Sequence, residues 1–198
     1  MKYNVYKKNI KGLLVIEPVL YQDDRGFFIE SYKKKDFEKI GINEYFVQDN
    51  YSSSKKGVFR GLHFQTKKTQ SKLIKVTRGM GVSFAVDLRH KSSTFGCYEK
   101  VLLSDKNKLM FYIPKGFAHG FLSLEDNTEL YYKCSDYYDS DAESGIYWLD
   151  SDLKIEYELE KHGLKSEEII LSEKDKTQQT LKEFMEKRIR LEDDGINF

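Results

Sequence analysis

The chain has 198 residues, a length that suits one domain with a short tail. Hydrophobic residues make up 39% of the chain and aromatic residues 14%, a composition too apolar for an intrinsically disordered protein. The formal net charge is +1, so no overall basic field favours nucleic acid as a partner.

The N-terminal residues and the cysteines bear on the cellular compartment. No apolar stretch of the kind found in secretory signal peptides follows the N-terminal residues 1–8. No segment approaches the roughly 18 apolar residues of a membrane-spanning helix. Cys97 and Cys134 are far apart and form no Cys-x-x-Cys pair. We therefore expect a cytoplasmic protein with two free thiols and no membrane partner.

Short apolar and aromatic runs predict strands along most of the chain. The clearest is residues 82–88, where every second residue is apolar. Further strands are predicted at residues 13–16, 26–32, 72–77, 98–103, 110–113, 120–124, 129–133 and 146–148. Short strands separated by turns favour an antiparallel sandwich or barrel over parallel βαβ units.

Two segments predict helices, at residues 34–40 and 173–190. In the second, apolar side chains recur at helical spacing, and we expect them to pack on the body of the protein: Leu181, Phe184, Met185 and Ile189. We divide the chain into a main domain, residues 1–176, and a C-terminal helical extension, residues 177–198, packed on it. The last residues, 191–198, are predicted to be loose.

Several common catalytic motifs are absent. The sequence contains no glycine-rich phosphate loop and no Gly-x-Ser-x-Gly elbow. The histidines are His63, His90, His119 and His162, and no two of them are two or four residues apart. We therefore predict no metal and no cofactor.

Three segments carry more polar groups than buried strands usually do: residues 46–52, 57–65 and 113–121. If the second segment is extended, Phe59, Gly61 and His63 share one face and the residues between them share the other. A single imidazole in a strand is more often a satisfied core or surface histidine. Because titratable and phenolic groups recur on neighbouring predicted strands, a concave polar pocket is favoured here.

Two motifs are specific enough to indicate a family. Arg-Gly-Leu-His-Phe-Gln stands at residues 60–65 and Gly-Phe-Ala-His-Gly-Phe at residues 116–121. Shorter blocks at residues 24–31, 46–50 and 171–175 accompany them. In this ordered set, over about residues 10–175, the chain resembles the dTDP-4-dehydrorhamnose 3,5-epimerases. The resemblance implies an all-β cupin double-stranded β-helix (jelly roll) with a few short helices and a C-terminal helix.

The resemblance also implies a reaction, namely inversion of C3 and C5 beside the C4 ketone of a nucleotide-linked 4-keto-6-deoxy sugar. Such deoxysugars are built into surface polysaccharide. By resemblance, His63 is the base and Asp175 holds its imidazole in one tautomer. Tyr132 returns a proton on the opposite face, and the ammonium of Lys72 stabilises the enolate. The family uses no metal or cofactor.

The resemblance assigns substrate contacts as well. Arg25 and Arg60 would bind the diphosphate, for which a guanidinium is suited. The remaining positions would contact the base and the sugar, with Tyr138 stacked on the base: Phe28, Glu30, Gln48, Asn50, His119, Tyr138, Glu143 and Lys174. Members of the family form homodimers in which strands exchange between the sheets of the two subunits. The resemblance therefore implies that Arg25, Phe28 and Glu30 serve the partner's site.

Some features depart from the family pattern and leave alternatives open. Residues 66–71 match poorly, and residues 156–165 are strongly charged. The alternatives are an epimerase acting at C3 only or C5 only, an epimerase of GDP-linked 4-keto-heptoses, a 3,4-ketoisomerase, and a non-catalytic cupin that binds a sugar nucleotide. Because the ordered motifs and the set His63, Tyr132 and Asp175 are complete, we favour the 3,5-epimerase.

Overall fold

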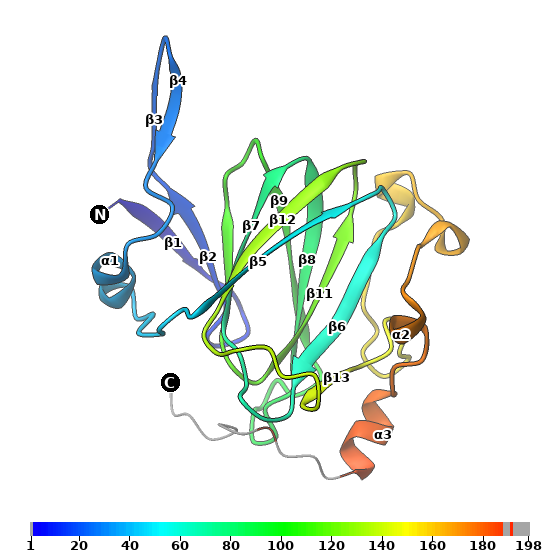
Figure 1. Cartoon of the computed structure of the whole chain (residues 1–198). Coiled ribbons are helices and arrows are strands. Elements are labelled where there is room, and N and C mark those ends of the chain that lie inside the picture. Colours follow the sequence, from blue (N-terminus) through cyan, green and yellow to red (C-terminus); the bar gives the residue numbers. More distant parts are fainter. Residues whose placement is uncertain (1, 188–190, 192–198) are drawn as a thin grey trace.

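A computed structural model describes residues 2–187 and 191. Two antiparallel sheets pack face to face (Figure 1). The six-stranded sheet contains, in spatial order, β1 (Tyr3–Lys7), β2 (Leu14–Pro18), β10 (Met110–Ile113), β7 (Lys72–Arg78), β12 (Thr128–Cys134) and β5 (Gln48–Ser54). The five-stranded sheet contains β13 (Glu143–Gly145), β6 (Phe59–Gln65), β11 (Phe117–Ser123), β8 (Met80–Asp87) and β9 (Tyr98–Ser104). The predicted all-β jelly roll with a few short helices is confirmed.

Three clusters of buried apolar side chains hold these layers together. One lies between the two sheets and includes Ile74 of β7 and Phe121 of β11. A second lies between the six-stranded sheet and helix α1 (Lys34–Lys39), where Phe37 is buried. The third lies between the five-stranded sheet and the C-terminal segment. Strand β8 is buried along nearly its whole length because both of its faces are covered.

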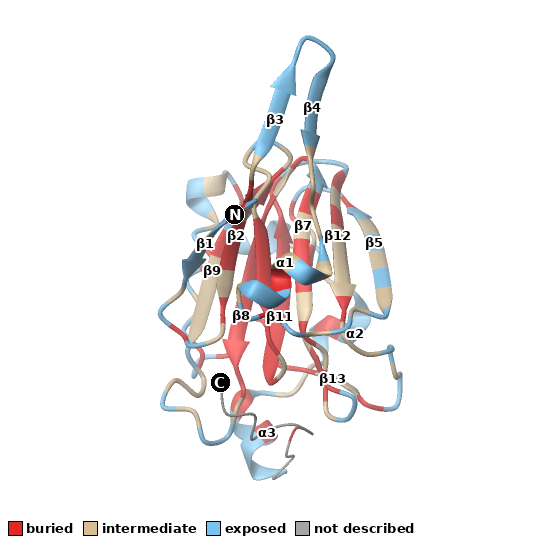
Figure 2. Cartoon of the chain, turned by 90° about the vertical axis from the view of Figure 1, so that its left-hand side faces the viewer, coloured by how far each residue is buried: buried red, intermediate tan, exposed pale blue. Residues whose placement is uncertain are grey.

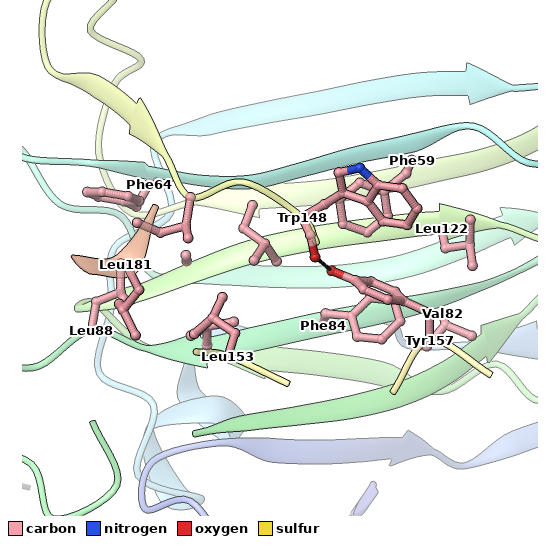
Figure 3. Close-up of a cluster of buried hydrophobic side chains, with 14 of the residues drawn as sticks. Phe59, Phe64, Val82, Phe84, Leu88, Leu122, Trp148, Leu153, Tyr157 and Leu181 are labelled. Carbon is pink, nitrogen blue, oxygen red and sulfur yellow. Dashed lines mark hydrogen bonds between the residues drawn. The ribbon is translucent and has the colours of Figure 1, made fainter. Parts of the chain in front are cut away.

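The third cluster attaches the C-terminal segment to the barrel through aromatic rings (Figure 3). The ring of Trp148 packs against Phe59 of β6 at 5.6 Å between centroids, and against Tyr157 at 5.1 Å. The hydroxyl of Tyr157 donates a hydrogen bond to the backbone oxygen of Trp148. Aromatic side chains bury large apolar areas, so this cluster fixes the course of the segment that follows.

The predicted single helix at 173–190 is wrong. The structure has two short helices, α2 (Glu173–Lys176) and α3 (Leu181–Glu186), separated by an extended stretch in which Gln179 forms a parallel bridge with Ile146. A capping box at Thr180 begins the second helix, a local signal that competes with a continuous helix. Leu181 and Phe184 are buried as expected, whereas Met185 is 50% exposed.

Other expectations for the C-terminal half have mixed outcomes. The predicted strand at 146–148 is wrong, because β13 ends at Gly145 and Ile146 keeps only its isolated bridge. The charged segment contains two short 3₁₀ turns, η1 (Glu160–His162) and η2 (Ser166–Glu168). Ile189 and residues 192–198 lie outside the described residues. The prediction that residues 191–198 are loose is wrong for Leu191, which is buried in the third cluster. The division of the chain at residue 176 stays a prediction.

A two-stranded hairpin stands away from the body, as Figures 1 and 2 show. It consists of β3 (Leu20–Asp23) and β4 (Gly26–Ile29), so the strand predicted at 26–32 is shorter than expected. Its large side chains are exposed, among them Phe28 at 67%. Within the described residues, no helix is long and apolar enough to cross a membrane.

Candidate active site

A cavity of about 210 Å³ opens where the edges of the two sheets approach each other. Strands β5, β7 and β12 of one sheet and β6 and β13 of the other contribute its walls. The cavity brings together these residues that the sequence singled out: Gln48, Asn50, His63, Lys72, Tyr132, Tyr138 and Glu143. It therefore combines a base, a cation, a phenol and amides in one concave polar site.

Strand β6 directs His63 into this cavity by means of a bulge. Phe121 of β11 lies opposite Arg60, but His119 lies opposite His63, so β6 contains one extra residue between the two pairs. A bulge of this kind interrupts the alternation of side chains. Consequently Phe59 and Leu62 pack in the same apolar cluster, and the predicted grouping of Phe59 with His63 on one face is wrong.

Asp175 of helix α2 contacts the imidazole of His63. Its carboxylate Oδ1 lies 2.5 Å from Nε2 of His63, and Asp175 is only 3% exposed. Burial alone would raise the pKa of Asp175, but hydrogen bonds from His63 and Ser172 outweigh it and hold the pKa below its usual range. With Nε2–H donated to Asp175, the lone pair is on Nδ1 of His63, which can accept a proton.

Lys72 and Tyr132 lie on neighbouring strands of the opposite wall. Burial lowers the pKa of Lys72, and nearby Cys134 and Glu143 only partly offset this effect. Burial, followed by Cys134, raises the pKa of Tyr132 to about 12, against an opposing influence of Arg60. The phenol therefore keeps its proton at neutral pH and is available as a donor.

Tyr138, Glu143 and Lys174 form a polar cluster at the cavity. The hydroxyl of Tyr138 donates to Oε2 of Glu143 at 2.5 Å, and Lys174 forms an ion pair with the same carboxylate. Burial would raise the pKa of Glu143, but these two partners lower it overall. The backbone N–H of Tyr138 donates to Gln48, whose amide donates in turn to Asn50 at 3.0 Å. Tyr138 is 55% exposed, so a ligand can reach its side chain.

Arg60 and His119 lie near the cavity without lining it. Arg60 donates through Nε to the hydroxyl of Ser54 at 3.1 Å. His119 is buried, with Nε2 at 2.9 Å from the hydroxyl of Ser83. Burial, with the charges of Lys72 and His63, lowers the pKa of His119 well below the usual imidazole value. His119 is therefore neutral at physiological pH.

The structure does not bring Arg25, Phe28 and Glu30 to the His63 cavity of the same chain. Arg25 and Phe28 belong to the projecting hairpin of β3 and β4 (Figure 1). There Arg25 forms an ion pair with Asp23 at 2.5 Å. Glu30 follows the hairpin and forms an ion pair with Lys2 at 3.0 Å.

Sequence reasoning missed two glutamines of the cavity wall, Gln65 and Gln70. The amide of Gln65 donates to the backbone oxygen of Lys68 at 2.8 Å and accepts from the N–H of Asp139 at 2.9 Å. Gln65 is two residues after His63 in one strand, a spacing that could have identified it. Gln70 donates to the backbone oxygen of Asp136 at 2.8 Å. Among the described residues, no cluster of His, Cys, Asp and Glu could hold a metal ion.

Comparison with known proteins gives this site a family context. The family model described as dTDP-4-dehydrorhamnose 3,5-epimerase matches residues 7–183. A protein of that name from Methanothermobacter thermautotrophicus (strain Delta H) is 44% identical over 182 residues, covering 92% of this chain and 96% of the relative. Another from Escherichia coli (strain K12) is 45% identical over 184 residues, covering 92% of this chain and 96% of the relative.

A solved structure agrees with the sequence relatives. The dTDP-6-deoxy-D-glucose-3,5-epimerase of Legionella pneumophila Philadelphia 1, in complex with dTDP-4-keto-L-rhamnose, has a TM-score of 0.88 and 43% identity to this chain. The match covers 95% of this chain and 97% of the other. The sequence, the fold and the site thus point to one family, and this chain belongs to the dTDP-4-dehydrorhamnose 3,5-epimerases.

Proposed function

We propose that this protein inverts C3 and C5 of a dTDP-linked 4-keto-6-deoxy sugar in deoxysugar biosynthesis. The observation that carries the proposal is the His63–Asp175 pair, 2.5 Å apart, in a cavity that Tyr132 also lines. The Legionella relative bound to dTDP-4-keto-L-rhamnose supports this class of substrate. A base and a phenolic acid in one cavity suit the exchange of protons at carbons beside a ketone.

Each inversion begins with removal of a proton. His63 takes the proton from the carbon beside the ketone through Nδ1, and the bonding electrons pass into an enolate. Asp175 stabilises the imidazolium that forms. Lys72 stabilises the negative oxygen, because a cation held in a partly buried site acts strongly on developing charge. Tyr132 then donates its phenolic proton to the other face of the carbon, which completes the inversion. Before the next inversion His63 releases its proton to water, and the phenolate of Tyr132 takes one up.

The remaining predicted residues bind the nucleotide. Arg60 binds the diphosphate, and Tyr138 stacks on the base through its exposed ring. Gln48 and Asn50 offer hydrogen bonds to the sugar and the base from the cavity wall. His119 stays a predicted contact of the ligand, although it is buried beside Ser83. Glu143 and Lys174 contact the ligand at the same end of the cavity as Tyr138. Glu143 already accepts a hydrogen bond from Tyr138 and forms an ion pair with Lys174.

The exposed hairpin supports a homodimer in which Arg25, Phe28 and Glu30 complete the partner's site. An aromatic hairpin that stands away from its own chain is suited to burial against a second copy. Two inactive variants test this arrangement, Arg25→Ala and His63→Asn. If the hairpin acts in the partner's site, mixing them forms dimers with one intact site, and activity returns. If mixing restores nothing, the hairpin does not complete the partner's site.

The reaction itself is tested by mass spectrometry in heavy water, with dTDP- and GDP-linked 4-keto-6-deoxy sugars as substrates. We expect two deuterons in the dTDP sugar, and none with His63→Asn, which should still bind dTDP. One deuteron would mean an epimerase of a single carbon or a ketoisomerase, which NMR of the product separates. Binding without any uptake would mean a non-catalytic cupin.

A further inference from the structure

Helices α2 and α3 begin with the same local arrangement. In each, a hydroxyl residue is the N-cap and a carboxylate stands three residues later: Ser172 with Asp175, and Thr180 with Glu183. In both, the backbone N–H of the acidic residue donates to the hydroxyl oxygen at 3.1 Å. The two helices therefore form a matched pair for separating capping from any other role.

The two carboxylates are used differently. Oε2 of Glu183 accepts the backbone N–H of Thr180 at 2.7 Å, which completes an ordinary capping box. Asp175 lies with Oδ1 against Nε2 of His63 at 2.5 Å, while Oδ2 accepts the hydroxyl of Ser172 at 2.8 Å. The acid of α2 is thus turned away from its own helix and toward the imidazole.

This arrangement restricts the rotation of the buried carboxylate. Each oxygen of Asp175 has its own donor, and rotating the carboxylate out of its present plane would break two charge-assisted hydrogen bonds. Asp175 is only 3% exposed, so water replaces a lost donor poorly. No contact of Ser172 with the cavity itself is needed for this effect, because it acts through Asp175.

We propose that Ser172 is a positioning residue of the catalytic pair, whose hydroxyl holds the Asp175 carboxylate in the orientation that His63 requires. The proposal rests on the proposed function of His63 as the base. The hydrogen-bond chain runs from Ser172 to Asp175 to His63, across two segments that are far apart in the sequence. Through this chain of hydrogen bonds, the C-terminal segment contacts the residue that removes the proton.

A dependence on pH follows from the same contacts. The hydroxyl of Ser172 helps to lower the pKa of Asp175, after His63, which contributes more. Removing the hydroxyl raises the pKa of Asp175, so this carboxylate becomes protonated at a higher pH as acid is added. The acid limb of the kcat profile should therefore move to higher pH in Ser172→Ala. Two other charged groups near the pair, Glu143 and its partner Lys174, are unchanged in this variant.

The test compares Ser172→Ala, Ser172→Thr and Thr180→Ala by thermal unfolding, by kcat and KM, and by pH profile. We expect Ser172→Ala to lower kcat by about 10-fold, with KM little changed and the acid limb moved to higher pH. Ser172→Thr keeps a hydroxyl and should restore most of kcat. Thr180→Ala loses a cap without touching the catalytic pair, so it should lower Tm and leave kcat and the acid limb unchanged.

The outcomes separate this proposal from the proposed function. An active wild type with equal kcat and equal acid limbs in Ser172→Ala and Thr180→Ala would show that Ser172 is only a helix cap. A wild type that incorporates no deuterium from heavy water would overturn the epimerase function, and the role of Ser172 with it.

Discussion

The ammonium of Lys72 lies 5.7 Å from the centre of the Tyr132 ring, on strands β7 and β12, which are neighbours in the six-stranded sheet. Both groups face the cavity that His63 enters from the other sheet. One wall thus holds the base, and the opposite wall holds the cation and the phenol. This division between two sheets suits a reaction that removes a proton from one face of a sugar and delivers a different proton to the other face.

Replacing Lys72 by methionine should lower kcat roughly 100-fold or more, because the enolate loses its cation while the volume of the side chain is largely kept. Burial lowers the pKa of Lys72, so the wild type should lose activity on the alkaline side at a lower pH than that at which an ordinary lysine titrates. The pKa of Tyr132 is about 12, so the phenol is not the first group to lose its proton there. Profiles of kcat against pH for the wild type and Lys72→Arg check this assignment. An alkaline limb that stays in place in Lys72→Arg, which remains charged, would contradict it.

Replacing Tyr132 by phenylalanine removes the proton donor and keeps the ring. We expect deuterium uptake from heavy water to continue, because His63 can still remove a proton and return a deuteron to the same face. The inverted product should form about 100-fold more slowly. Tyr131→Phe is the matched control, since its hydroxyl donates to Asp49 and does not line the cavity. Inversion at the wild-type rate in Tyr132→Phe would exclude this phenol as the acid, as NMR of the product would show.

Replacing Gly61 by alanine should destabilise the protein by at least about 2 kcal/mol. Gly61 has a φ of +132°, and an added Cβ would lie 2.6 Å from the Cα of Gly120 and from the backbone oxygen of His119. Gly26 is the control, because its φ is +124° and nothing lies within 4 Å of an added Cβ. Thermal unfolding should show a Tm lower by roughly 4–8 °C for Gly61→Ala and a smaller loss for Gly26→Ala. Equal losses would mean that the backbone angle alone, and not the close strand contact, sets the cost.

Replacing Phe184 by alanine should cost about 3 kcal/mol of unfolding free energy. Its ring meets Phe64 edge-on, with 5.3 Å between centroids, and is 3% exposed. Met185 is 50% exposed, and Met185→Ala should change stability by no more than about 0.5 kcal/mol. Urea unfolding of both variants measures the difference. A small cost for Phe184→Ala would show that α3 contributes little to the fold.

The class of fold and the identity of the chemical groups could be predicted from the amino-acid sequence alone. Alternating apolar residues such as those of β8 predict a strand wherever they occur, because the period of two is a property of the local backbone. The motif around His63 indicated the family in the same way, since it is contiguous in the chain. The sequence also contains the capping box of Thr180 and Glu183, which marks the start of a second helix. The prediction of one long C-terminal helix overlooked this signal.

The way in which these groups meet depends on tertiary contacts. His63 and Asp175 are 112 positions apart, and the contact depends on the aromatic cluster that fixes the C-terminal segment against the five-stranded sheet. The face on which His63 points depends on a bulge, which a pattern of alternating residues does not reveal. Arg25 is likewise far from the cavity because its hairpin stays exposed and does not pack on the body of its own chain. The local sequence does not reveal this separation. Such contacts join distant parts of the sequence, and the free energy that selects them arises from the whole packed structure.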